Sequence, residues 1–225
     1  MCFKYLLYLS LLLLQLGCSH TPAAAASSGY FCHPDFYQAV SQKGLTILPH
    51  FKTIQQSTDY TCGPVVIQMV TQYFQGQPLH DEMTMTALVH CKPSKGTSIK
   101  NLRGYFRRLD WQVDSSEDSR GPEKPEEFTS FVLQRLRSNT PIMVENVDWG
   151  GHWRIIIGYD TMLTPEITDD VIILADPYDL GDQLRDGYVI ENAQKFFYMW
   201  FSPLTYAPGA RYRHWVTARP LSSLT

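Results

Sequence analysis

The apolar residues of this chain change their spacing partway along the sequence, and this change limits the folds that it can adopt. After residue 63 they recur at three- and four-residue steps, as on the buried side of a helix. Beyond residue 140 the apolar runs are short and rich in valine and isoleucine, which is typical of strands. Helices followed by strands predict an α+β domain, with N-terminal helices packed against a C-terminal antiparallel sheet.

The apolar stripe after residue 63 predicts a helix that begins next to Cys62. Its members are Val65, Val66, Met69, Val70, Tyr73 and Phe74. Pro64 falls in the first turn, where a missing N–H costs no hydrogen bond, and Gly76 ends the pattern. Further helices are expected from about Leu79, after Thr97-Ser98, and over residues 128–136.

Three segments in the second half are predicted to be successive antiparallel strands. They read "PIMVENV", "HWRIIIGYD" and "DDVIILAD", and "DWGG" and a turn near residues 161–167 separate them. Residues 114–127 are charged and contain two prolines, so a solvated loop is expected there. The aromatic residues at 196–201, with Trp215, are interpreted as core or as the lining of a substrate groove, and core is favoured.

The size and charge of the chain exclude some functions. Its 225 residues are 44% hydrophobic, which suffices for one sizeable core, and residues 30–225 are expected to form a single domain. The net charge is −3 and the basic residues are scattered. Because no basic surface is available to attract phosphates, nucleic acid is not expected as a partner.

The N-terminal segment predicts export. Residues 1–17 carry one basic residue and then an apolar stretch that is too short to span a bilayer, so they read as a signal peptide. Leu16-Gly17-Cys18 resembles the lipobox of bacterial lipoproteins, in which the cysteine is lipidated, although Gln15 departs from that pattern. Residues 18–29 are expected to be a flexible tether. These features predict a lipid anchor at Cys18, in the bacterial cell envelope on the periplasmic face of the outer membrane; plain secretion or an uncleaved anchor is the alternative.

Export leaves three cysteines in an oxidising compartment, namely Cys32, Cys62 and Cys91. Three is an odd number, so at least one thiol stays free within the chain. A bridge between Cys32 and Cys91 would leave Cys62 free, but this is one of three pairings, and the sequence does not choose among them.

Cys62 lies where a nucleophilic thiol would benefit from its surroundings. Only a thiolate attacks, so an enzyme must lower the ordinary cysteine pKa of about 8.5 with a helix N-terminus, a histidine or both. If residues 152–160 and 170–176 pair as antiparallel neighbours, His152 and Asp176 meet at one edge of the sheet. The imidazole could then pair with the sulfur while the carboxylate orients the ring.

An amide six residues before Cys62 completes the predicted site. The side chain of Gln56 can direct its NH2 toward the same pocket as the backbone N–H of Cys62, which would form an oxyanion hole. Gln55, one position away, is the competing candidate.

The segments "QSTDYTCGP", "GGHWRIIIGYD" and "LADPYD" resemble, in this order, papain-fold cysteine peptidases of the bacteriocin-leader-processing (double-glycine) type. The resemblance spans about residues 53–179. It implies that Gln56 is the oxyanion donor, Cys62 the nucleophile, His152 the base and acid, and Asp176 the orienting carboxylate of a hydrolase that acts on peptide or isopeptide bonds. Val65 departs from the usual alanine, and no ATP-binding motif follows, so neither ATP nor a fused transporter is expected.

Other chemistries are weighed against this hypothesis. Ligand types such as His80, Asp81 and Glu82 occur without metal-site spacing, so neither a metal nor another cofactor is expected. No Gly-x-Ser-x-Gly is present for a serine hydrolase. A catalytically silent lipoprotein that binds peptides in the same groove, and an acyltransferase or transpeptidase with the same triad, remain the alternatives.

Overall fold

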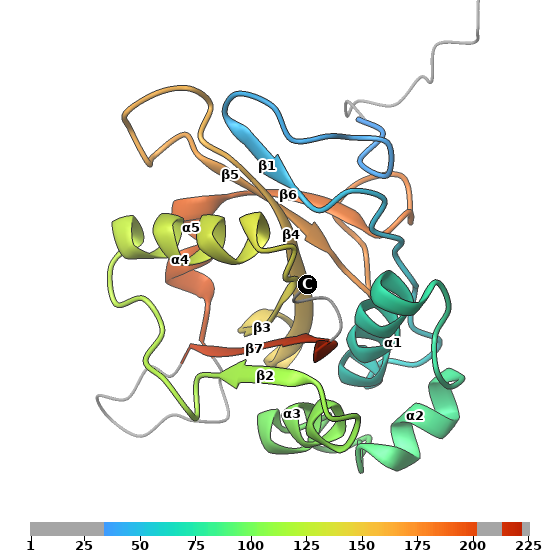
Figure 1. Ribbon diagram of the computed structural model, residues 1–225. Coiled ribbons are helices and arrows are strands. Elements are labelled where there is room, and N and C mark those ends of the chain that lie inside the picture. Colours follow the sequence, from blue (N-terminus) through green and yellow to red (C-terminus); the bar gives the residue numbers. More distant parts are fainter. Residues whose placement is uncertain (1–33, 202–212, 222–225) are drawn as a thin grey trace, which may run out of the picture. The chain divides into compact units, whose positions relative to one another are not determined.

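An antiparallel sheet organises the chain, and helices cover both of its faces (Figure 1). The computed structural model describes residues 34–201 and 213–221. The predicted signal peptide, Cys18, the tether and Cys32 lie outside the described residues. No helix within the described ranges has the length and apolar character needed to cross a membrane.

The sheet has seven strands in the order β2-β7-β3-β4-β5-β6, and β1 pairs with β4 beyond the end of β3. The strands are β1 (Leu45–Ile47), β2 (Gln112–Ser115), β3 (Ile142–Asn146), β4 (His152–Asp160), β5 (Val171–Ala175), β6 (Tyr188–Asn192) and β7 (His214–Arg219). The helices are α1 (Cys62–Gln75), α2 (Glu82–Leu88), α3 (Ile99–Arg108), α4 (Pro125–Arg137) and α5 (Ala193–Met199), with a short 3-10 turn, η1 (Asp148–Gly150).

Local sequence signals explain the helix boundaries. Helix α1 ends at Gly76, whose φ of 81° is in the left-handed region that favours glycine. The Asp81 side chain accepts hydrogen bonds from two N–H groups at the start of α2, and Ser98 caps α3 in the same way. The four helices predicted from apolar spacing and caps are therefore confirmed, with α2 beginning three residues later than Leu79.

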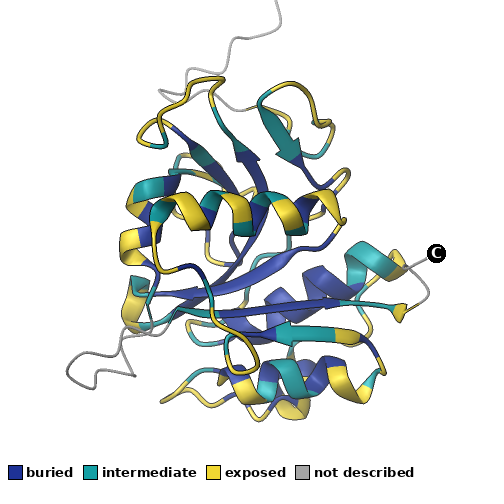
Figure 2. Ribbon diagram, turned by 60° about the vertical axis from the view of Figure 1, so that its left-hand side comes forward, coloured by how far each residue is buried: buried dark blue, intermediate teal, exposed yellow. Residues whose placement is uncertain are grey.

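Packing on both faces buries the middle of the sheet. Helix α1 lies against one face of β4, and α4 lies against the other, close to α5 (Figure 1). Every residue of β3 is buried, as is every residue of β4 except Asp160 (Figure 2). Phe196, Phe197, Trp200 and Trp215 are buried, so the preferred interpretation as core is confirmed for these four residues, whereas Tyr198 is 54% exposed and does not belong to the core.

The loop predicted over residues 114–127 is wrong at both of its ends. Asp114 and Ser115 belong to β2, which pairs with β7, and residues 125–127 form the first turn of α4. Pro125 suits this turn because its missing N–H would have no intrahelical partner there. The predicted α+β class is confirmed, although β1 and β2 precede the main group of strands and α5 interrupts it.

Candidate active site

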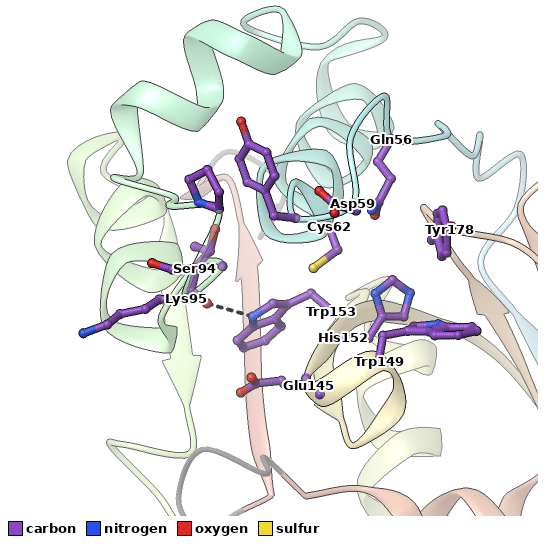
Figure 3. Close-up of a pocket in the computed structure, with 16 residues that line it drawn as sticks. Gln56, Asp59, Cys62, Ser94, Lys95, Glu145, Trp149, His152, Trp153 and Tyr178 are labelled. Atoms are coloured by element: carbon purple, nitrogen blue, oxygen red, sulfur yellow. Dashed lines mark hydrogen bonds between the residues drawn. The ribbon is translucent and has the colours of Figure 1, made fainter.

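The start of α1 places the Cys62 sulfur in a pocket (Figure 3). Cys62 is buried, at 6% exposure, and is the first residue of the helix, where the unpaired N–H groups and the helix dipole favour negative charge. The preceding residue, Thr61, does not cap the helix with its side chain. Its hydroxyl donates instead to Glu82 of α2.

Glu82 fixes the segment that leads into Cys62. Its two carboxylate oxygens accept the Ser57 N–H at 2.9 and 3.1 Å, in addition to the hydroxyl of Thr61. The hydroxyls of Thr58 and Thr61 lie 2.8 Å apart. This segment is therefore held at several points, and the N-terminus of α1 is presented to the pocket in a defined position.

The second residue of α1 has no room for a side chain. A Cβ atom on Gly63 would lie 2.5 Å from both Cβ and Oγ1 of Thr97. Thr97 is itself fixed, because its carbonyl accepts a hydrogen bond from the Trp153 indole at 2.9 Å. Glycine at this position lets the 93–97 loop approach the helix start and form one wall of the pocket.

Gly63→Ala is expected to lower the free energy of unfolding by about 1–3 kcal/mol, because the added methyl group forces the loop or the helix to move. Chemical denaturation measures this loss. Gly104→Ala in α3 is the matched control, since its Cβ would meet only the end of Arg108 at 3.8 Å. At this half-buried position inside α3 the added methyl group meets no close contact and favours the helix, so the control substitution is expected to be neutral or stabilising. Equal stability of the two variants would contradict the close approach described here.

The sheet brings His152 and Asp176 together. Strand β4 begins at His152, and the register with β5 pairs Ile155 with Ala175, so Asp176 follows directly at the same edge. His152 Nε2 lies 2.7 Å from Asp176 Oδ1, and both side chains are buried. The Asp176 oxygen also accepts the Tyr178 N–H at 2.8 Å. The second ring nitrogen, Nδ1, is left for Cys62.

These contacts change the acidities of both groups. Burial lowers the pKa of His152, but the hydrogen bond and negative charge of Asp176, together with the influence of Cys62, outweigh burial and raise the pKa to about 9. Burial raises the pKa of Asp176, but the hydrogen bond and charge of His152 and the charge of Arg154 hold this pKa below its usual range. At neutral pH the pair is therefore an imidazolium beside a carboxylate.

Arg154 supports this pair from two residues along the same strand. Its Nη1 lies 2.5 Å from Glu191 and 3.6 Å from the second oxygen of Asp176, and its Nη2 lies 3.3 Å from Asp148. Arg154 is 2% exposed, so these carboxylates balance a charge that water does not reach. Arg154 was not among the residues predicted for the site, although a charge inside the apolar run "HWRIIIGYD" is a signal of a functional or structural role.

The two glutamines before the helix have different environments. Gln56 lines the pocket, its Nε2 donates to the Thr58 carbonyl at 2.6 Å, and its Oε1 is buried without a hydrogen-bond partner. Gln55 instead holds the turn after β5, because its amide bonds the Asp176 carbonyl at 2.8 Å and the Asp179 N–H at 3.2 Å. Gln56, the residue expected at the pocket, thus lies there, whereas Gln55 supports the backbone next to Asp176.

The pocket has a volume of about 360 Å³ and combines an aromatic side with an acidic residue. Trp149 is 70% exposed and its ring meets that of Tyr178 edge to face, with centroids 5.9 Å apart. Trp149, Gly150 and Gly151 have φ values of 56°, 83° and 123°, so the chain enters β4 through three successive left-handed residues. Glu145 lies farther along the wall, below Trp153 (Figure 3).

Both described cysteines are free thiols. Cys91 is buried and donates to the Tyr60 carbonyl at 3.3 Å, and burial raises its pKa. Cys62 forms no bridge with it. Within residues 34–201 and 213–221, no group of three or more histidine, cysteine, aspartate or glutamate side chains could hold a metal ion.

A cysteine at a helix start, facing a histidine and a carboxylate on adjacent antiparallel strands of an α+β fold, is the arrangement of papain-like cysteine peptidases. The chain belongs to the Peptidase C39 like family, whose model matches residues 49–200. Its fold is similar to that of the peptidase domain of Streptococcus ComA, described as a bi-functional ABC transporter involved in a quorum-sensing pathway. That match has a TM-score of 0.52 and 13% identity, and covers 76% of this chain and 99% of the other. No curated protein matches the chain at a significant level.

Proposed function

We propose that this protein is a lipid-anchored cysteine hydrolase that cleaves a peptide or isopeptide bond with Cys62, His152, Asp176 and Gln56. The observation that carries the proposal is the buried contact of 2.7 Å between His152 and Asp176, beside a cysteine at a helix N-terminus. Membership of a cysteine peptidase family supports the same reaction class.

In the proposed reaction the Cys62 thiolate attacks the substrate carbonyl carbon and forms a C–S bond, while the C=O electrons move to the oxygen. The backbone N–H of Cys62 and the Gln56 amide donate hydrogen bonds to that oxyanion. Collapse of the intermediate breaks the C–N bond, and the His152 imidazolium protonates the departing amine. Neutral His152 then takes a proton from water, which attacks the thioester and releases the carboxylic acid and the thiolate.

Asp176 and Gln55 act through the groups that they hold. The Asp176 carboxylate holds Nε2 of the ring, which leaves Nδ1 for the sulfur, and it stabilises the imidazolium. Gln55 bonds the backbone on both sides of Pro177 and so maintains the position of that carboxylate. One N–H of the Gln56 amide is engaged by Thr58, which leaves the other for an oxyanion.

The experiment compares the alkylation of Cys62 by iodoacetamide at pH 6 in native and urea-unfolded protein, by mass spectrometry of the peptide that contains Cys62. An activated thiolate reacts on the order of a hundredfold faster in the native protein. Equal rates would exclude the proposed nucleophile and favour a protein that only binds peptides. Cys91, buried and with a raised pKa, is the internal control that stays unreactive in the native state.

The lipid anchor is the part of the proposal that rests on Leu16-Gly17-Cys18. Expressed in a bacterial host, the wild-type chain is expected to partition into the detergent phase on phase separation, whereas Cys18→Ser moves to the aqueous phase. A single acyl chain gives only marginal membrane binding, so the strong partitioning of a multiply acylated cysteine is the result to look for. Cys91→Ser, which leaves the anchor intact, is the control.

A further inference from the structure

The pocket wall contains a buried carboxylate that the proposed reaction does not use. Glu145 lies in β3, paired with Trp153 of β4 on one side and with His214 of β7 on the other. It is 7% exposed, and it lines the same pocket as Cys62 and His152 (Figure 3). A buried carboxylate is costly unless it is paired, so its partners decide what it can bind.

The partners of Glu145 leave one of its oxygens available. His214 Nδ1 lies 2.5 Å from Oε2, whereas Oε1 has no hydrogen-bond partner in the described part of the chain. Within the same residues, no lysine or arginine pairs with Glu145. Lys95, the one lysine among the described residues that line the pocket, extends its ammonium group away from Glu145 (Figure 3). The wall therefore offers a carboxylate oxygen, which accepts hydrogen bonds, to whatever fills the pocket.

We propose that Glu145 is a subsite for a positively charged ammonium group of the substrate, an inference that rests on the proposed function. The preferred substrate is then a peptide with a lysine-like side chain, or a free amine, close to the bond that is cleaved. Burial strengthens such a contact, because water competes little for the carboxylate there. Since His214 occupies one oxygen, the other suits a compact ammonium group better than a guanidinium, which prefers two parallel bonds.

Peptidyl vinyl sulfones test the proposal, because these probes extend on both sides of the carbon that a thiol attacks. Each probe carries either lysine or the uncharged, similarly shaped norleucine at one position at a time, and the rate at which it labels Cys62 is measured. At one position the lysine probe is expected to label the wild-type protein about tenfold faster than the norleucine probe. This factor corresponds to the typical contribution of a hydrogen bond to a charged group. In Glu145→Gln the two probes become equal within about twofold.

Two variants control this comparison. Asp59→Asn removes the other carboxylate that lines the pocket, but Asp59 is exposed and screened by solvent, so the lysine preference is expected to persist. Glu145→Asp keeps the carboxylate but shortens the side chain. Its preference for the lysine probe is expected to fall between those of the wild type and Glu145→Gln. This variant replaces Glu145→Gln if that protein fails to fold.

The outcomes separate this inference from the proposed function. If iodoacetamide alkylates Cys62 rapidly but no probe position favours lysine, or no vinyl sulfone reacts, the subsite is refuted while the nucleophile stands. A lysine preference that survives in Glu145→Gln, or disappears in Asp59→Asn alone, also refutes it. Slow alkylation by iodoacetamide refutes the proposed function instead.

Discussion

His152→Ala is expected to slow the alkylation of Cys62 at pH 6 by about a hundredfold. An ordinary thiol with a pKa near 8.5 is only about 0.3% ionised at this pH, whereas a thiolate paired with an imidazolium persists. The contacts of His152 raise its pKa to about 9, so the imidazolium is available throughout the neutral range. The measurement is the rate of iodoacetamide labelling of Cys62, with unfolding midpoints to verify that the variant is folded.

The pH dependence gives a second readout of the same pair. His152 has a raised pKa in the folded state, so the stabilisation that it provides is complete below about 6.5 and is lost as the pH rises through about 9. Asp176 has a lowered pKa, so its contribution to stability is present above about pH 3.8 and is lost as the pH falls through its folded-state value.

Rapid labelling of Cys62 at pH 6 that is unchanged in His152→Ala would show that another group activates the sulfur.

Arg154→Met is expected to lower the free energy of unfolding by about 3–5 kcal/mol. Methionine fills much of the same volume, but it leaves the buried Asp176 without one counter-charge and removes the partner of Glu191. Chemical denaturation at pH 7 gives the loss. Without the charge of Arg154 the pKa of Asp176 should also rise toward its ordinary value. When the pH is lowered, the labelling rate of Cys62 is therefore expected to decline at a higher pH in Arg154→Met than in the wild type.

Arg120→Met is the matched control for this prediction. Arg120 also pairs with a glutamate, Glu123, at 2.9 Å, but its side chain is 90% exposed and water screens the pair. Its substitution is expected to change stability by no more than about 0.5 kcal/mol. A similar effect of both substitutions would mean that the buried network around Arg154 does not contribute in the way its geometry indicates.

The sequence predicted the elements whose signals are strong and local. The stripe from Val65 to Phe74 and the run "HWRIIIGYD" gave α1 and β4, and antiparallel pairing gave the contact between His152 and Asp176. Strand β2, "QVDS", was missed because it is short and polar and is formed by pairing with β7, more than 90 residues away in the sequence. Tertiary pairing, rather than propensity, determines such strands.

The supporting parts of the candidate site were beyond sequence reasoning for the same physical cause. Arg154 and Glu191 meet only because β4, β5 and β6 are neighbours, and Glu145 meets His214 only because β7 inserts beside β3. The choice between Gln55 and Gln56 depended on which side chain the turn after β5 would engage. None of these contacts has a signature in local spacing, since each joins segments that are brought together by the sheet.

The position of β1 affects how the domain would bear mechanical load. Strand β1 pairs with Gly158–Asp160, at the far end of β4 from His152, and six residues of extended strand span roughly 20 Å. Strand β1 is the first strand of the sheet in chain order, so a pull on the N-terminal side of the chain reaches this three-residue pairing before any other strand. Strand β1 could then peel away under tension while the pairing of β4 with β3, which holds His152, stays intact.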